Sequence, residues 1–143
     1  MMRVFSRAAD GEERVQANFR VREFACKDGT DPVFVDGELA ELLQRVREHF
    51  GAAVTISSAY RTVAHNSSKQ VGGSPRSQHI YGRAADIQVK GVSPEAVARY
   101  AETLMPDKGG IGVYATFTHV DVRPGRSRWD SRSGKQVRVE GWR

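Results

Sequence analysis

The chain has 143 residues, of which 39% are hydrophobic and 27% are charged. This length fits one domain with a core of its own, and this composition is typical of a soluble globular protein. No stretch approaches the roughly 20 apolar residues of a membrane-spanning helix, so we expect no membrane insertion. The single cysteine, Cys26, excludes an internal disulfide and a cluster of zinc thiolates, and we expect it to be a small buried residue.

The net charge of +5 is unevenly distributed along the chain. Residues 1–121 carry 15 basic and 15 acidic side chains, whereas residues 122–143 carry seven basic and two acidic ones. Such a segment attracts anionic polymers, or it is simply a solvated edge. Among anionic polymers we expect bacterial wall polymers rather than nucleic acid, because only Trp129 and Trp142 interleave with the basic residues.

We therefore predict one monomeric domain over residues 1–143, with an N-terminal arm at about residues 1–17 and a basic C-terminal tail at about residues 124–143. The N-terminal sequence MMRVFSRAADGEERV has no apolar run long enough for the core of a signal peptide. We expect cytoplasmic synthesis, with action outside the cell only after export by another system or release, for example by a phage or prophage at lysis.

The first predicted elements lie in the N-terminal third. NFRVREFACKDG indicates a short strand or a helical turn that leads into a turn-rich patch. A helix then follows, which Asp36 caps and Gly51 ends. Its apolar residues recur on one helical face, at Leu39, Leu42, Leu43, Val46 and Phe50.

Two strands and a long loop come next. AAVTISSAY predicts a strand with Val54 and Ile56 on one face. Residues 61–78 are polar and rich in Gly and Ser, and so long a loop in a small domain is usually functional or disordered. RAADIQVK predicts a second strand, in which Asp86 points away from the apolar residues Ala85, Ile87 and Val89.

The last part of the chain predicts a helix and further strands. Ser93 caps the helix and Pro106 ends it. GIGVYATFTHVDVR predicts two strands, the second with Thr118, Val120 and Val122 on one face and with Phe117, His119, Asp121 and Arg123 on the other. SGKQVRV adds a turn and a short strand. The fold class is therefore α+β, with a small, mainly antiparallel sheet and flanking helices.

Three of the polar side chains suggest a metal site. His79, Asp86 and His119 converge if the strands that carry Asp86 and His119 are neighbours. Two imidazoles and a carboxylate, with a fourth position open to water, form the ligand set of a catalytic zinc ion. The alternative is a loop histidine, an aspartate at a strand edge and a surface histidine. His49, near the end of its helix, is expected to be structural.

The segments SSAYRTVAHN, VGGSPRSQHIYGRAADI and FTHVDVR together resemble the zinc D-Ala-D-Ala carboxypeptidase family and its phage endolysin relatives, which share a fold with hedgehog signalling domains. The resemblance covers about residues 18–129. It implies a hedgehog/DD-peptidase-like fold and a Zn²⁺ ion bound by His79, Asp86 and His119. It also implies that Arg61 binds the substrate near the scissile peptide or a terminal carboxylate, a task suited to its planar fork.

One departure from that pattern concerns the general base. Several members of the family place a glutamate three residues before the last zinc histidine, or a histidine two residues before it, where this chain has Thr116 and Phe117. Asp121 is then the candidate base, and its alternative role is to orient His119. His65 in the polar loop is a third candidate base.

The sequence thus predicts a zinc metallopeptidase that cleaves peptidoglycan stem peptides, as a D-Ala-D-Ala carboxypeptidase or an endolysin-type endopeptidase. Its proposed catalytic residues are Asp121 and Arg61. The alternative is a cell-wall-binding module of the same fold that keeps the metal and does not catalyse. A nucleic-acid-binding protein ranks last, because the basic tail has no interleaved aromatic residues apart from Trp129 and Trp142. Such a protein would show strongly salt-dependent binding to DNA.

Overall fold

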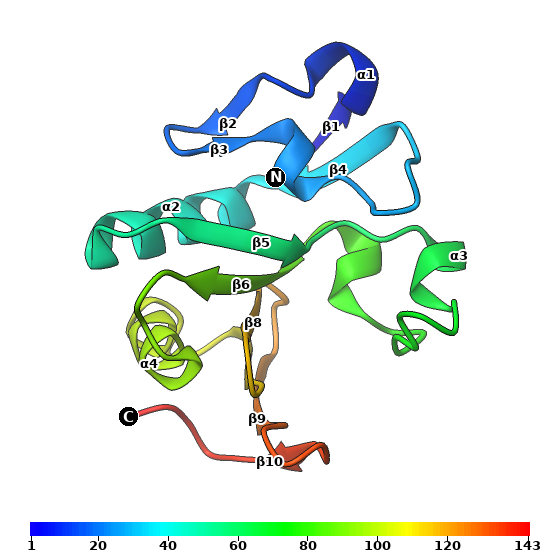
Figure 1. Ribbon diagram of the computed structural model, residues 1–143. Helices are drawn as coiled ribbons and strands as arrows, with labels where there is room; N and C mark the ends of the chain where they lie inside the picture. The colour runs from blue at the N-terminus through cyan, green and yellow to red at the C-terminus, as the bar shows by residue number, and fades with distance from the viewer.

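The computed structural model describes all residues from 1 to 143 and centres on a six-stranded sheet (Figure 1). The strand order is β10-β9-β7-β8-β6-β5, and every neighbouring pair is antiparallel except β7 with β9. The strands of this sheet are β5 (Val54–Ser58), β6 (Ala84–Val89), β7 (Gly109–Val113), β8 (Thr118–Asp121), β9 (Arg126–Asp130) and β10 (Val137–Arg138). The predicted α+β class with a mainly antiparallel sheet is confirmed.

The N-terminal third adds two small antiparallel ribbons. β1 (Met2–Ser6) pairs with β4 (Pro32–Asp36), and β2 (Arg14–Gln16) pairs with β3 (Phe19–Arg20). Between the strands lie the short helix α1 (Arg7–Asp10) and the 3₁₀ turn η1 (Val21–Phe24). The predicted N-terminal arm therefore includes strands that pair with later parts of the chain.

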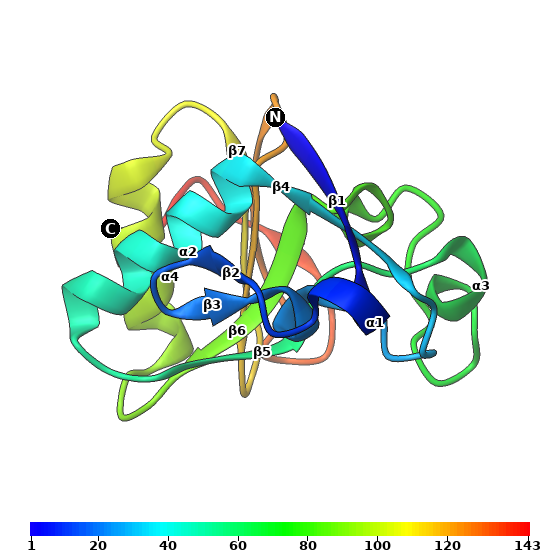
Figure 2. The same cartoon turned by 90° about the horizontal axis from the view of Figure 1, so that it is seen from above.

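Two amphipathic helices lie on one side of the sheet, and the loop that carries the short helix α3 (Val63–Asn66) lies on the other (Figure 2). α2 (Gly37–Phe50) begins after its cap Asp36 and ends at Gly51, as its apolar spacing predicts. α4 (Pro94–Leu104) begins after Ser93, whose hydroxyl accepts a hydrogen bond from the Ala96 amide. Both predicted helices are confirmed.

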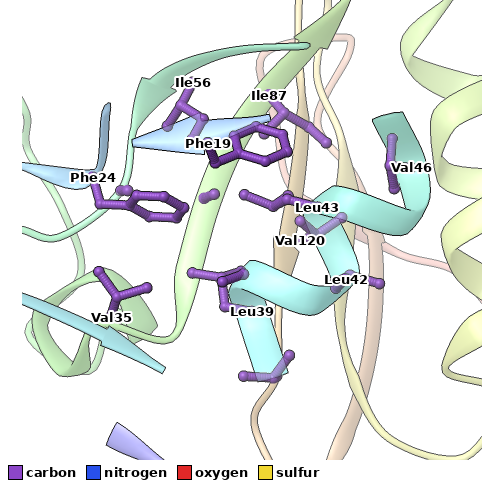
Figure 3. Close-up of a cluster of buried hydrophobic side chains, with 14 of the residues drawn as sticks. Phe19, Phe24, Val35, Leu39, Leu42, Leu43, Val46, Ile56, Ile87 and Val120 are labelled. Carbon is purple, nitrogen blue, oxygen red and sulfur yellow. The ribbon is translucent and has the colours of Figure 1, made fainter. Parts of the chain in front are cut away.

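The core fills the space between the helices, the sheet and the N-terminal ribbons (Figure 3). Leu39, Leu43 and Val46 of α2 are almost completely buried, and Ile87 and Val120 supply the facing sheet surface. Phe19 and Phe24 close the core from the N-terminal side with their rings in an edge-to-face arrangement. This packing fixes the face of β6 and β8 that points inward, and so fixes which side chains point away from the core.

The C-terminal segment contains a strand of the main sheet as well as exposed basic residues. Residues 126–130 form β9 beside β7, and the nearby Trp142 is 6% exposed. Arg128 is buried because its guanidinium group pairs with Glu102 of α4 at 2.8 Å. Glu102 also accepts a hydrogen bond from the backbone amide of Trp142. The charge count left open whether this segment is solvated or binds anionic polymers. Residues 132–138 are exposed, whereas Arg128 is buried with a partner that lies 26 residues away in the sequence.

None of the helices combines the length and the apolar character that crossing a membrane requires.

Candidate metal centre

The structure brings His79, Asp86 and His119 together. Asp86 of β6 lies directly opposite His119 of β8 in the antiparallel register. His79 reaches the same point from η2 (Gln78–Tyr81), the 3₁₀ turn that precedes β6. One potential ligand atom from each of the three residues lies within 4.8 Å of the other two, and all three residues are at least nine-tenths buried. The predicted convergence is confirmed, while the binding of a metal stays a prediction.

The His79 ring is held in one tautomer by the backbone. Its Nδ1 atom lies 2.7 Å from the carbonyl oxygen of Ala59. Because a carbonyl oxygen only accepts hydrogen bonds, Nδ1 carries the proton and Nε2 keeps its lone pair. Nε2 faces Asp86 Oδ2 at 3.3 Å. Burial lowers the pKa of His79, which further favours this neutral form.

The His119 ring lies between two carboxylates. Its Nε2 atom is 2.7 Å from Asp121 Oδ2, and its Nδ1 atom is 3.0 Å from Asp86 Oδ1. Burial alone would lower the pKa of His119, but the hydrogen bonds to Asp121 and Asp86 raise it to about 9. Nε2 donates its hydrogen bond to Asp121, so the lone pair of Nδ1 faces Asp86 once Nδ1 gives up its proton, as binding of a metal ion would require.

This arrangement fits a bound cation. His79 Nε2 lies 3.3 Å from Asp86 Oδ2 and His119 Nδ1 lies 3.0 Å from Asp86 Oδ1, so two imidazole nitrogens meet one carboxylate. Without an ion, a proton on His119 Nδ1 bridges that ring to Asp86, and a cation bound at this point would take the place of that proton. The pKa of Asp86 lies well below its usual range, because hydrogen bonds from the two histidines outweigh the effect of burial. An anionic oxygen and two imidazole lone pairs are the donor set of a catalytic zinc site. The residues present therefore fit the ion that the sequence predicts.

Asp121 is placed to orient His119. The side chain of Asp121 is completely buried, and it is absent from the walls of the cleft beside the metal centre. Its oxygens accept hydrogen bonds from five groups, namely the Gly110 amide, the Arg123 amide, Arg123 Nε, Arg123 Nη2 and His119 Nε2. Two carboxylate oxygens offer about four lone-pair sites, so none remains for a water proton. The geometry favours the orienting role over that of a base.

Two glycines of β7 make room for the groups around His119. A Cβ atom at Gly110 would collide with the Asp121 carboxylate, and one at Gly112 would collide with the Trp129 indole. Trp129 is buried, and its ring centre lies 5.1 Å from that of His119. The glycine-rich sequence of β7 is therefore a requirement of close packing against the site.

Arg61 is held beside the metal centre by three partners. Its Nε donates to Ser58 Oγ at 3.0 Å, Nη1 to Asn66 Oδ1 at 3.2 Å and Nη2 to Asp86 Oδ2 at 3.4 Å. Its side chain is 14% exposed. A guanidinium group has five N–H bonds, so one N–H on each terminal nitrogen stays free of these contacts. Arg61 lines the cleft, so these two N–H bonds belong to a cleft residue.

The cleft has a volume of about 700 Å³ and a positively charged wall. Arg61, Arg76 and Arg123 line it, whereas Asp86 is the only carboxylate that does. Tyr114 lies on the same wall, and its hydroxyl accepts a hydrogen bond from Trp129 Nε1 at 3.1 Å. This charge distribution suits a substrate that carries carboxylates.

The structure identifies no separate general base in the cleft. Thr116 is exposed and does not line the cleft, and Phe117 lines it with a ring that stacks on Tyr114. His65 also lies outside the lining, near Cys26 and Asp28. Neither Asp121 nor His65, the candidate bases named from the sequence, lines the cleft.

Sequence reasoning missed the residues that hold the predicted ones. Asn66 is fully buried, and it connects Arg61 to the loop because its Nδ2 donates to the Ser74 carbonyl oxygen at 2.8 Å. Ala59 orients His79 through a backbone oxygen, which leaves no signal in the residue type. Arg123 was placed on the correct strand face, but its two-pronged contact with Asp121 requires the side-chain geometry.

Comparison with known proteins gives two results. The model of a family described as Peptidase M15 matches residues 15–121, which include all three candidate ligands. A protein of Haemophilus influenzae named probable peptidoglycan L,D-endopeptidase MepK is 31% identical over 101 residues, which are 65% of this chain and 53% of that protein. The chain therefore spans about half the length of this curated relative.

Proposed function

Because the chain belongs to the Peptidase M15 family, we propose that it is a zinc-dependent peptidase that hydrolyses a peptide bond in the stem peptide of peptidoglycan. The observation that carries this proposal is the pair of buried imidazoles whose ring nitrogens meet the same carboxylate, Asp86, in an arginine-lined cleft. The printed name of the Haemophilus influenzae relative supports peptidoglycan as the substrate.

We assign the metal ligands as His79 Nε2, Asp86 and His119 Nδ1. A zinc ion held there would lower the pKa of a water molecule to about 7 and polarise the scissile carbonyl. The Ala59 carbonyl and Asp121 keep the two rings in the tautomers that direct lone pairs inward. In this assignment Asp121 is a positioning residue.

Arg61 is the substrate-binding residue of the proposal. Its contacts with Ser58 and Asn66 fix the guanidinium plane before substrate arrives, and its two free N–H bonds are available to a substrate carboxylate or to the oxygen that gains charge. Because these donors are already oriented, little conformational entropy is lost when the substrate binds.

Without a dedicated general base, the proposed hydrolysis can still proceed but at a lower rate. A general base contributes typically 10²- to 10⁴-fold to the rate. Water with a pKa of about 7 is partly ionised at neutral pH without one. We therefore expect turnover slower by roughly that factor than in a peptidase with the same ligands and a placed base.

One observation also favours the second candidate, a cell-wall-binding module that keeps its metal without catalysis. Asp86 is the only carboxylate that lines the cleft, and it is assigned to the metal. Such a module would bind stem peptides through Arg61 and release no products.

Digestion of purified peptidoglycan decides between the two candidates. The protein is assayed as prepared, after chelation and after zinc is restored, beside His79→Ala and the control His49→Gln on α2. The peptidase proposal expects soluble muropeptides that disappear with chelator and with His79→Ala, together with the loss of one metal per chain in that variant. Binding without products at every zinc level would favour the module.

Mass spectrometry of products from defined muropeptides then separates the two modes of cleavage. A carboxypeptidase releases a terminal D-alanine, whereas an endopeptidase cuts within the stem or its cross-link. We further propose that the protein reaches the wall after release, for example at phage lysis, and that its other partners are anionic wall polymers.

A further inference from the structure

A second group of metal-ligating side chains lies outside the cleft. Cys26 and Asp28 belong to the loop after η1, and His65 belongs to α3. One potential ligand atom from each lies within 4.8 Å of the other two. None of the three lines the cleft beside His79. We propose that Cys26, Asp28 and His65 form a second, structural site for Zn²⁺ or a similar divalent transition metal, independent of the proposed catalytic centre.

The donor set suits zinc. A thiolate, an imidazole and a carboxylate are all zinc ligands, with bonds of about 2.0–2.3 Å. Atoms bound to one tetrahedral ion at those lengths lie about 3.3–3.8 Å apart, so separations up to 4.8 Å close by side-chain rotations of about 1 Å. Cys26 is 2% exposed, while Asp28 is exposed and His65 is partly exposed, so an ion can approach from the solvent side.

Thr62 contacts the side chains of Cys26 and Asp28 and the backbone of His65. Its backbone amide donates to Cys26 Sγ at 3.4 Å, and its hydroxyl donates to Asp28 Oδ2 at 2.7 Å. The same hydroxyl accepts the backbone N–H of His65 at 3.1 Å. The Thr30 amide donates to the other Asp28 oxygen at 2.9 Å. Metal ligands are commonly oriented by such outer hydrogen bonds, which limit the reorganisation that binding requires.

A metal ion at this site would join the N-terminal segment to the segment that binds substrate. Arg61 immediately precedes Thr62, and Asn66, which accepts a hydrogen bond from Arg61, immediately follows His65. Other contacts between the two segments include the hydrogen bond from the Tyr60 amide to the Phe24 carbonyl oxygen and the packing of Phe34 against Tyr60. Since an ion that binds only the folded chain stabilises it, we expect the site to stabilise the fold and the position of Arg61.

Cobalt substitution tests the site directly. Because Cys26 is the only cysteine, a Co²⁺–thiolate charge-transfer band reports this site alone, and the His79 centre, which has no sulfur ligand, cannot produce it. We expect two Co²⁺ ions per chain and a thiolate band in the wild type. Cys26→Ser should remove the band and one ion, and His65→Ala and Asp28→Asn should weaken both.

Two further variants make the result specific. His79→Ala should keep the band and lose the other ion, so a failure of the catalytic centre and a failure of this site give different results. His49→Gln should match the wild type in both measurements. A single ion per chain with no thiolate band would overturn the proposal. So would a band that His65→Ala and Asp28→Asn leave unchanged, since Cys26 would then bind cobalt alone.

Discussion

Replacement of Asp121 by asparagine separates the two roles that a carboxylate beside His119 can play. Asparagine keeps the shape of the side chain but offers one acceptor oxygen and one NH₂ group. With the oxygen toward Arg123 and Gly110, the NH₂ group faces His119 Nε2 and forces the ring proton onto Nδ1, the nitrogen that we assign to the metal. With the opposite orientation, the NH₂ group meets the donors of Gly110 and Arg123.

Neither orientation satisfies the site, so we expect a loss of zinc affinity. Loss of a group that orients a metal ligand costs typically 10- to 100-fold in affinity. We expect the upper end, about 100-fold or about 2.7 kcal/mol, because all five donors to Asp121 come from groups fixed by the backbone or by its neighbours. Turnover at saturating zinc should then recover most of the wild-type rate.

The assay combines zinc affinity, from competition with a chromophoric chelator, with muropeptide release across a zinc titration. All proteins carry Cys26→Ser, so the titration reports the His79 centre alone. Asp107→Asn, at an exposed position, is the matched control and should behave as the wild type. The reasoning is refuted if Asp121→Asn binds zinc normally and loses about 100-fold or more of its turnover at every zinc level, the result that a general base predicts.

Three further predictions follow from contacts elsewhere in the structure. Arg61→Lys should lower kcat/KM at least about tenfold, or about 1.4 kcal/mol, with unchanged zinc content. The reason is that a lysine ammonium group cannot make the two parallel hydrogen bonds of a guanidinium group. Unaltered kinetics would show that Arg61 does not bind the substrate. Glu102→Gln should cost about 3–5 kcal/mol in denaturant unfolding at neutral pH, because Arg128 loses its buried partner. Burial opposes ionisation of Glu102, but hydrogen bonds from Arg128 lower its pKa. The difference in unfolding free energy between the wild type and Glu102→Gln should therefore be largest above the ordinary glutamate pKa of about 4.3, and it should shrink as pH falls through the lowered pKa. Gly110→Ala should displace Asp121 and so weaken zinc binding while it leaves the secondary structure seen by circular dichroism intact, and normal zinc affinity would contradict the packing argument.

The sequence predicted the elements whose signals are local. The spacing of Leu39, Leu42 and Leu43 is enough to define one face of α2, and the alternation around Ile87 and Val120 is enough to define which face of each strand points inward. The order of strands in the sheet is a long-range property. The predicted metal site assumed that the strands of Asp86 and His119 are neighbours. The structure shows that they are, because Asp86 of β6 pairs with His119 of β8.

The parts that could not be predicted depend on partners distant in sequence. The charge count could not separate Arg128 from the solvated basic residues around it, because its buried partner Glu102 lies 26 residues away. Cys26 is buried, as predicted, but its proximity to Asp28 and His65 leaves no local signal in the sequence. Composition and charge totals cannot contain that information.

The groups that orient the rings of His79 and His119 could not be predicted from the sequence either. His79 is directed by a backbone carbonyl, and His119 is directed by a carboxylate that itself depends on the absence of a side chain at Gly110. The ligand motif therefore names the three residues that could hold a metal, while the ring orientations that would let them bind it are set by groups with no distinctive residue signal. A chain with the same three candidate ligands but larger side chains in β7 would keep the motif and lose the contact between Asp121 and His119. The functional assignment therefore rests on the groups that orient the histidine rings as much as on the candidate ligands.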